Sequence, residues 1–198
     1  MTETVGILDA LVARVLDEYP YRFTLAGTEA ERSIAYRLRA AAVVDEGWAA
    51  PETFPDGMER DDYDADAVQV VGWYEGDAVS TGRLVLPPGP LPTEDTCDIV
   101  VEPRGRVVDV GRMAVVRSHR TFQHAAFLAL LCRLYLEMRT RGYEVACGMM
   151  SHRARRLVRL LGLELDELGE ERTYWCEPRS PVRFVLTTNV AAIRQRWE

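Results

Sequence analysis

The sequence lacks the features that mark metalloproteins, secreted proteins and membrane proteins. Its four cysteines form no CxxC pair and have no zinc-like spacing with the three histidines, so we expect no metal site. The amino terminus has no basic region followed by an apolar core, and no apolar run reaches membrane-spanning length. We therefore expect a cytoplasmic protein without a membrane span.

Basic residues are also in the minority. Lysine and arginine together count 24 against 31 aspartates and glutamates, which gives a formal net charge of -7. This balance argues against a nucleic-acid partner. Cys132 and Cys147 lie in apolar runs, where a free cysteine is usually a small buried side chain. A nucleophilic cysteine paired with a histidine stays open, because such pairs form in space rather than in sequence.

The length of 198 residues and the hydrophobic content of 47% predict one domain with a substantial core. Helical spacing predicts an amphipathic helix that stops at Pro20 and a second helix from about Glu29 to Ala42. We assign residues 1–45 to amino-terminal helices and a cap, and residues 67–198 to a sheet core. Between them lies a loop with nine acidic residues against Arg60, a net charge of -8 over residues 45–66.

The second half of the chain predicts a sheet with one parallel crossover. Residues 67–74 and 78–86 are β-rich and flank a short turn that contains Gly76, which indicates a hairpin. Residues 107–116 predict a strand that leads into an apolar helix from about Phe122 to Arg139, and residues 143–150 predict the next strand. Ser151 is a candidate N-cap for a helix over 152–161. Two strands, around 173–176 and 182–187, and a last helix ending in Trp197 complete the expected order.

Charged and aromatic residues recur in ordered blocks between residues 34 and 116. The blocks are Tyr36-Arg37-Leu38-Arg39, Gly47-Trp48, Met58-Glu59 with Asp61 and Asp64, Ser80 to Leu84 around Arg83, and Asp109-Val110-Gly111-Arg112-Met113. Their order and spacing resemble the acyl-homoserine-lactone (autoinducer) synthases, and more weakly so through Phe127-Leu128-Ala129 and residues 151–163. Long-chain N-acyl amino acid synthases are similar over the same blocks and also at residues 174–184.

The resemblance implies a GCN5-related N-acyltransferase (GNAT) fold, an α/β fold with a mixed, mostly antiparallel twisted sheet and flanking helices. It also implies transfer of an acyl group from a pantetheine thioester to an amine, with acyl carrier protein or acyl-CoA as the donor and no tightly bound cofactor. In such enzymes the counterparts of seven residues organise the cap and the acceptor site: Arg39, Trp48, Asp61, Asp64, Arg83, Asp109 and Arg112.

Elementary chemistry assigns roles within this set. An amine is protonated near neutral pH, so it needs carboxylates to bind the ammonium and a base to remove its proton. We expect Asp61 and Asp64 to bind the ammonium and Asp109, with Arg112, to be catalytic. The arginines would pair with these carboxylates, and for Arg83 a structural ion pair is the favoured interpretation. A solvated acidic loop is the alternative for Asp61 and Asp64.

Two positions bear on the substrates. Autoinducer synthases usually have Phe where this chain has Val43, so the resemblance favours amide formation over lactone synthesis from S-adenosylmethionine. Coenzyme A-dependent relatives usually have glycine where this chain has Gln123, and glycine lets the backbone approach a diphosphate. An acyl carrier protein has no such diphosphate, which favours a carrier-bound donor.

Pantetheine is expected to lie along Met113, Ala114, Val115 and Val116, with a main-chain N–H near Val115 polarising the thioester carbonyl. An acidic carrier protein would dock on a basic surface, with an ordinary solvated face as the alternative. That surface would consist of Arg117, Arg120, Arg155, Arg156 and Arg159. Two other functions stay open, an autoinducer synthase that uses S-adenosylmethionine and a non-catalytic module that binds acyl groups or carriers.

Overall fold

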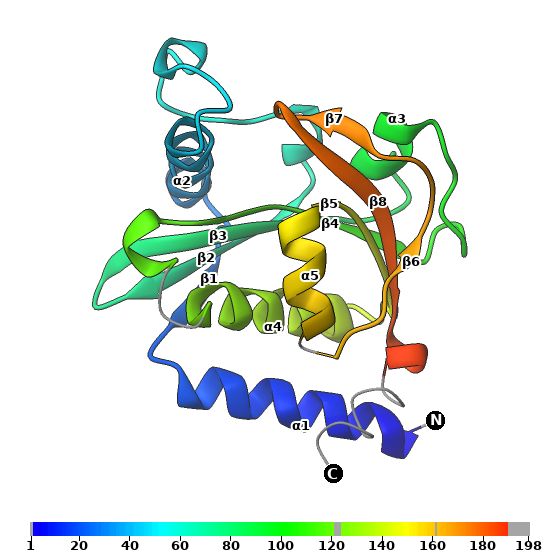
Figure 1. Cartoon of the computed structure of the whole chain (residues 1–198). Helices are drawn as coiled ribbons and strands as arrows, with labels where there is room; N and C mark the ends of the chain where they lie inside the picture. The colour runs from blue at the N-terminus through cyan, green and yellow to red at the C-terminus, as the bar shows by residue number, and fades with distance from the viewer. Residues whose placement is uncertain (1, 121–123, 161, 190–198) are drawn as a thin grey trace.

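The computed structural model describes residues 2–120, 124–160 and 162–189 (Figure 1). The α-helices are α1 (Thr2–Glu18), α2 (Glu29–Asp45), α3 (Pro92–Cys97), α4 (Ala125–Thr140) and α5 (His152–Leu160). Short 3-10 helices are η1 (Pro51–Thr53), η2 (Asp62–Asp64) and η3 (Arg117–His119). The strands are β1 (Arg22–Leu25), β2 (Val68–Tyr74), β3 (Asp77–Val85), β4 (Val107–Val115), β5 (Val145–Ser151), β6 (Asp166–Glu167), β7 (Arg172–Tyr174) and β8 (Glu177–Val185).

The strands form one eight-stranded sheet in the order β1-β2-β3-β4-β5-β8-β6, with β7 paired to β8. Neighbouring strands are antiparallel except β4 and β5, which are parallel and connected through α4. A parallel pair needs such a crossover, because its second strand must start at the same end as the first. The mixed, mostly antiparallel sheet with one parallel crossover is thereby confirmed.

Helices cover the two faces of the sheet unequally (Figure 1). Helices α2 and α3 lie on one face, α4 packs on the other, and α1 packs against the outer side of α4. The core on the α4 face consists of Val70, Leu84, Val108, Leu130, Leu134, Met138 and Ala146. The core on the α3 face consists of Val85, Leu91, Val101, Val107, Val145 and Cys147. Alternate residues of one strand therefore supply both cores, as the two-residue repeat of a strand requires.

Local sequence explains where several elements begin and end. Helix α2 starts at a capping box in which Thr28 accepts from the N–H of Glu31, while the Glu31 carboxylate accepts from the N–H of Thr28. Glu75 and Gly76 both have positive φ, as a tight turn between twisted antiparallel strands requires. Ser151 caps α5 by accepting from the N–H of Ala154, as predicted.

Some elements differ from the prediction or lie beyond it. The short strand β1 and the short helix α3 have too few residues to show a period. The tail is one hairpin of β7 and β8 with its turn at Trp175 and Cys176, so the predicted strand over 173–176 is wrong at its end. Residues 186–189 are helical. The predicted start of the crossover helix at Phe122 and the end of the last helix at Trp197 lie outside the described residues.

β4 and β5 pair over only part of their length. The ladder joins Val107 to Val145, Val108 to Ala146 and Asp109 to Cys147, and the described pairing ends there although both strands continue. At this point a Cβ on Gly148 would lie 2.5 Å from the carbonyl oxygen of Val110. Glycine therefore allows the closest approach of the two strands, immediately before they diverge. Within the described helices, none is long and apolar enough to cross a bilayer.

Candidate active site

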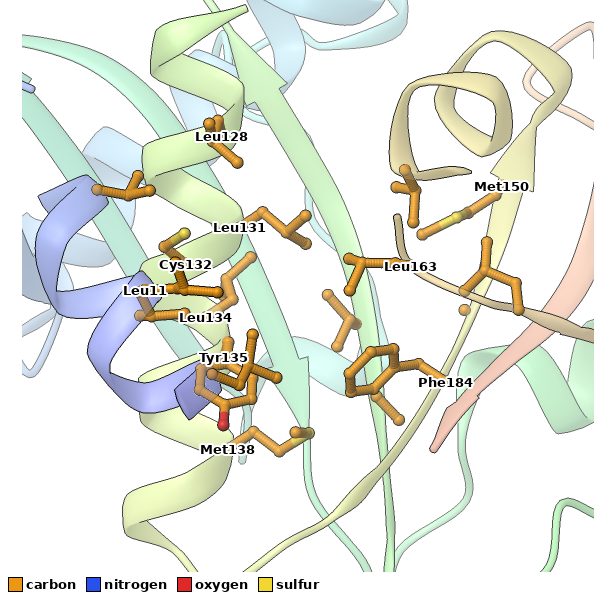
Figure 2. A pocket seen from close by; sticks show the side chains of 18 of the residues that line it. Leu11, Leu128, Leu131, Cys132, Leu134, Tyr135, Met138, Met150, Leu163 and Phe184 are labelled. Atoms are coloured by element: carbon orange, nitrogen blue, oxygen red, sulfur yellow. The ribbon is translucent and has the colours of Figure 1, made fainter. Parts of the chain in front are cut away.

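An apolar cavity of about 360 Å³ lies on the α4 side of the point where β4 and β5 diverge. It is bounded by α1, α4, β5, β8 and the segment after α5 (Figure 2). Its lining includes Leu11, Leu131, Leu134, Met150, Leu163 and Phe184. Val110 and Gly148 also line it, so the cavity reaches the gap between the two strands. The volume is within the usual range for small-molecule sites, and the lining suits an aliphatic ligand.

β4 carries a bulge next to this gap. Gly111 of β4 pairs with Arg83 of β3, and Ala114 pairs with Thr81. Two residues of β4 lie between these pairs, against one residue of β3. Arg112 lies in the bulge with a φ of 52°, a left-handed conformation that costs a non-glycine residue about 1–2 kcal/mol. A bulge leaves a main-chain group without its ladder partner and redirects a side chain. The Arg112 side chain is thus directed to the other face of the sheet, toward the acidic loop.

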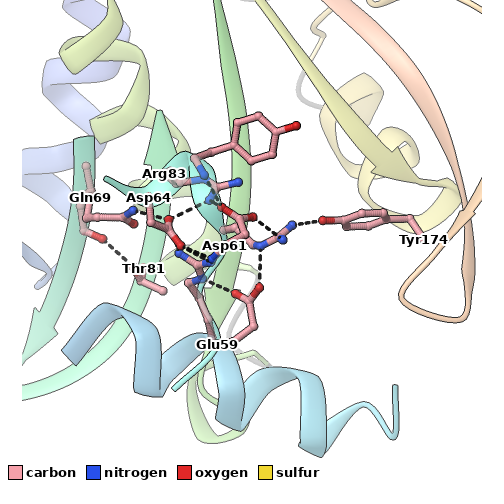
Figure 3. A network of polar contacts seen from close by, with 11 residues as sticks. Glu59, Asp61, Asp64, Gln69, Thr81, Arg83 and Tyr174 are labelled. Carbon is pink, nitrogen blue, oxygen red and sulfur yellow. Dashed lines mark hydrogen bonds and ion pairs between the residues drawn. The ribbon is translucent and has the colours of Figure 1, made fainter. Parts of the chain in front are cut away.

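Six charged side chains form a closed ring on that face, with cations and anions alternating (Figure 3). In order around the ring they are Arg39, Asp64, Arg83, Asp61, Arg112 and Glu59. Three guanidinium groups balance three carboxylates, so the ring is neutral as a whole. The chain contains no lysine, and a guanidinium keeps its charge where a buried ammonium would lose its proton. The cations of the ring are thus all of the type that tolerates burial as a charged group.

Asp64 is the most fully bonded member of the ring. Its Oδ1 accepts from Nη1 of Arg39 and Nη1 of Arg83, both at 2.7 Å, and from the Gln69 amide at 2.8 Å. Its Oδ2 accepts from Nη2 of Arg39 at 3.0 Å and from the N–H of Asp61 at 2.8 Å. With 4% of the residue exposed, no lone pair is left for a ligand. The prediction that Asp64 binds an ammonium, and the alternative of a solvated carboxylate, both disagree with this geometry.

Asp61 and Arg112 form the accessible edge of the ring, with 24% and 14% of their side chains exposed. Nη2 of Arg112 donates to Oδ2 of Asp61 at 2.7 Å, and Nε donates to Glu59 at 3.1 Å. Nη1 of Arg112 donates to the hydroxyl of Tyr174, which comes from β7 (Figure 3). Arg83 is 1% exposed, and among the described residues its hydrogen bonds go to the ring carboxylates Asp61 and Asp64, which fits a structural ion pair.

Trp48 reaches this edge indirectly, through an arginine from β8. The guanidinium of Arg179 lies 4.8 Å from the centre of the Trp48 ring and 5.8 Å from that of Tyr174. Burial lowers the pKa of Arg179, and nearby Arg112 lowers it too, while Glu177 opposes both. Contact with aromatic faces compensates part of the lost hydration. Trp48 thus borders the site through Arg179 and is not itself one of the six charged residues of the ion-pair ring.

Asp109 lies apart from the ring, at the last paired position of β4 and β5. Its Oδ2 accepts from the N–H of Thr93 at 2.8 Å, and the thiol of Cys147 lies 3.6 Å from the same oxygen. The other oxygen faces Gly111, where an added Cβ would lie 3.7 Å away, and no hydrogen bond from the described residues reaches it. Burial raises the pKa of Asp109 above its usual value, although Thr93 and the charge of Arg83 oppose the rise.

The sequence model of the N-acyl amino acid synthase FeeM family matches residues 34–179, well over half of the chain. The chain belongs to this family. The matched segment includes the charged ring, the bulge and Asp109. The protein is accordingly an acyltransferase that forms amides. No curated protein sequence matches the chain at significant similarity.

Solved structures agree with this membership at the level of the fold. The structure of FeeM, an N-acyl amino acid synthase from uncultured soil microbes, has a TM-score of 0.67 at 15% identity and covers 87% of this chain and 93% of its own. BjaI, a CoA-dependent acyl-homoserine lactone synthase solved with SAM and isopentyl-CoA, has a TM-score of 0.70 at 18% identity and covers 89% of this chain and 88% of its own. The AHL synthase LasI has a TM-score of 0.66 at 14% identity and covers 84% of this chain and 90% of its own. The GNAT-like fold expected from the sequence is confirmed.

Three of the four cysteines of this family member are poor candidates for a nucleophile. Cys97, Cys132 and Cys147 are buried, and burial raises the pKa of the Cys132 thiol to about 12. Burial and the neighbouring Asp109 raise the pKa of Cys147 further. A buried thiol that keeps its proton is a poor nucleophile. Cys176 is exposed in the turn between β7 and β8.

The five arginines of the expected docking surface occupy different environments. Arg155 is buried and donates to Ser180 and Glu167, so the prediction that it lies on the exposed face of α5 is wrong. Arg120 pairs with Glu46 and donates to the carbonyl of Val115 at 2.7 Å. Arg159 shares Glu167 at 3.2 Å. Arg117 and Arg156 are exposed, with no ion pair to the described residues. Gln123 lies outside those residues.

Glu59, Tyr174 and Arg179 belong to the site but were not assigned to it from the sequence. Glu59 lies in the Met58-Glu59 block of the resemblance, and Tyr174 and Arg179 lie in the tail that resembles N-acyl amino acid synthases. The block and the tail resemblance thus indicated the right segments, but they assigned no role to these three residues. β7 and β8 are distant from the bulge in sequence. The pairing of β8 with β5 brings them beside it in the folded chain.

Replacement of Asp64 with Asn should destabilise the protein by about 3–5 kcal/mol, because two buried guanidinium groups lose a shared carboxylate. Asp62→Asn, at an exposed neighbouring residue, is the control and should cost well under half of that. Urea unfolding measures both. Equal losses for the two variants would contradict a structural role for the ring.

The ring also predicts how stability depends on acid. Burial alone would raise the pKa of Asp64, but Arg39 and Arg83 outweigh it and hold the pKa at about 2, below the usual 3.8. The folded-state pKa is the lower one, so this stabilisation is complete above about pH 4 and is lost as the pH falls toward 2. Asp64→Asn should flatten that part of the stability profile, measured by urea unfolding at each pH.

Proposed function

We propose that the protein transfers an acyl group from a carrier-bound pantetheine thioester to the amine of a small amino acid-like acceptor, by direct attack in a ternary complex. One observation carries this proposal. The apolar cavity and the accessible edge of the charged ring lie on opposite faces of the sheet, and both adjoin the gap between β4 and β5. An acyl chain from one side and a polar amine from the other would meet at this gap.

The donor fits the free edge that β4 presents beyond Asp109. Residues 113–116 no longer pair with β5, so main-chain groups on that side, apart from the Val115 carbonyl that accepts from Arg120, can bond to the amides of pantetheine. The bulge at Arg112 and Met113 leaves an extra residue without a partner on β3, so a main-chain group there is available to bond elsewhere. We assign the polarisation of the thioester carbonyl to an N–H of this bulge, two or three residues before Val115.

The acceptor fits the edge formed by Asp61 and Arg112. Asp61 is the ring carboxylate with the greatest exposure, so it is the one that can accept from an incoming ammonium. Arg112 and Arg179 lie close by and favour an acceptor that also carries an anionic group. Trp48 and Tyr174 provide flat walls on either side of Arg179. These groups would bind the amine while the ring beneath them fixes their positions.

Asp109 is the group that accepts the proton. The ammonium gives up a proton to Oδ1 of Asp109, directly or through one water, and the freed nitrogen attacks the thioester carbon. A C–N bond forms, the C–S bond breaks, and the pantetheine thiol leaves with a proton. Burial makes Asp109 a stronger base than an exposed carboxylate, since it raises the pKa. The room beside Gly111 leaves space for the acceptor or a bridging water.

Replacement of Asp109 with Asn should lower kcat by about 10²–10⁴-fold while the protein still folds, because Asn can still accept from the N–H of Thr93. The wild-type rate should fall as the pH drops through the raised pKa of Asp109, and this acidic limb should vanish in the variant. Rates of thiol release across pH measure both. Asp77→Asn, at the exposed first residue of β3, is the control. Unchanged turnover for Asp109→Asn would remove this residue from the mechanism.

A carrier protein is the donor that the surface of α5 favours. His152, Arg155, Arg156, Arg159 and Leu160 line a shallow hollow of about 240 Å³ there. Leu160 is 58% exposed, which places an apolar side chain beside a basic patch. An acidic carrier protein with apolar contact residues would match both features. Arg117, Arg156 and Arg159 remain as docking residues, whereas Arg120 and Arg155 have structural partners.

A charge reversal on the surface of α5 distinguishes an acyl carrier protein donor from an acyl-CoA donor. Arg156→Glu should raise KM for acyl carrier protein at least several-fold, with little change for acyl-CoA, because only the carrier protein contacts α5. Arg106→Glu, at an exposed arginine between α3 and β4, is the matched control. The KM difference should shrink at high salt, since exposed charges are screened. An equal effect of Arg156→Glu on both donors would contradict docking at this place.

Lactone synthesis from S-adenosylmethionine is the second candidate, because BjaI was solved with SAM and shares the fold. Val43 is buried in α2 and its carbonyl accepts from the N–H of Trp48, so a smaller side chain stands where autoinducer synthases have an aromatic one. We predict that S-adenosylmethionine leaves the melting temperature unchanged. A concentration-dependent rise would favour lactone synthesis instead.

A further inference from the structure

We propose that α1 sets the length of acyl chain that the protein accepts, because it forms a wall of the apolar cavity. This inference rests on the proposed function in that the cavity is taken to hold the acyl chain. Helix α1 lies wholly before residues 34–179, the segment that the family model matches. A specificity element at this place would thus be additional to the part of the chain that defines the family.

The apolar stripe of α1 has two different environments. Leu8 and Val12 are buried against Cys132 of α4 and Leu186 after β8, which fixes the helix to the body of the protein. Leu11 and Val15 pack against the same cluster and, like Leu8 and Val12, line the cavity, but they stay partly exposed. The stripe therefore both anchors the helix and forms a wall of the cavity, and Leu11 and Val15 are its less buried members.

A polar contact fixes α1 along α4. The hydroxyl of Tyr135 donates to the Asp9 carboxylate at 2.6 Å, and Nε of Arg139 lies 3.8 Å from the same oxygen. Burial raises the pKa of Tyr135, and the Asp9 carboxylate raises it further, so the phenol keeps its proton and remains a donor. Tyr135 also lines the cavity. The residue that shapes the cavity is thus the one that holds the helix in register.

The opposite wall belongs to other parts of the chain. Figure 2 shows Leu11 beside α4, with Leu163 and Phe184 across the space from it. Among the described residues of the lining, the charged ones are Arg14 and Glu18, which pair with each other at 2.6 Å and are mostly exposed. The described lining is therefore mainly apolar, and its Tyr135 hydroxyl already donates to Asp9. The distance between the walls is what remains to discriminate one aliphatic chain from another.

Substitutions at Leu11 test the proposal in both directions. Leu11→Trp reduces the space, so the preferred donor should become shorter by at least one two-carbon step. Leu11→Ala enlarges the space, so the preference should move to longer chains. Each methylene that no longer fits should cost about fourfold in affinity, or about 15-fold for a two-carbon step. Ala13→Trp, on the exposed side of α1, is the matched control and should leave the length profile unchanged.

Two measurements distinguish this proposal from the proposed function. The first is kcat/KM for a series of acyl donors that lengthen by two carbons at a time. The second is the affinity for free fatty acids of the same lengths, by displacement of a fluorescent fatty acid, which needs no acyl transfer. Opposite shifts for the two Leu11 variants in the binding series support the role of α1 even if no amide forms. Unchanged profiles, or a uniform loss at every length, would overturn it.

Discussion

The closed ring of three arginines and three carboxylates is the constraint on which the rest of the site depends. It joins α2, the acidic loop, β3 and the bulge of β4, which are distant in sequence. Each member has two partners of opposite charge, and removing one would leave both neighbours with a single partner, so the ring is complete only when all four segments are in place. That requirement turns an acidic loop with little regular structure into a fixed part of the site, and it leaves Asp61 and Arg112 as the accessible edge.

The divergence of β4 and β5 links this polar face to the apolar one. After three paired positions, Gly148 allows one further close approach to Val110, and beyond it the two strands are no longer paired with each other. Asp109 stands at this junction, with one oxygen held by Thr93 and the other toward Gly111. In the proposed reaction the polar acceptor and the apolar chain approach from opposite faces of the sheet, and Asp109 lies beside the gap where they would meet. The same division explains how chain length and acceptor can be selected independently.

Much of the fold follows from periodicity, and the site follows only in part. The long helices, the β2–β3 hairpin and the crossover from β4 to β5 have clear patterns, while β1 and α3 are too short to show one. Resemblance found five of the six ring residues but could not separate Asp64, which has no free lone pair, from Asp61, which is exposed. Arg155 was placed on a solvated face because helical spacing cannot show that β8 lies beside α5.

The most direct measurement of the central claim is intact mass analysis of the products after incubation with acyl carrier protein and acyl-CoA donors and a panel of amino acids. The account predicts a new species whose mass equals acceptor plus acyl group less one hydrogen, formed together with an equal amount of free thiol. Free thiol accompanied only by the carboxylic acid, or no consumption of any donor, would contradict it.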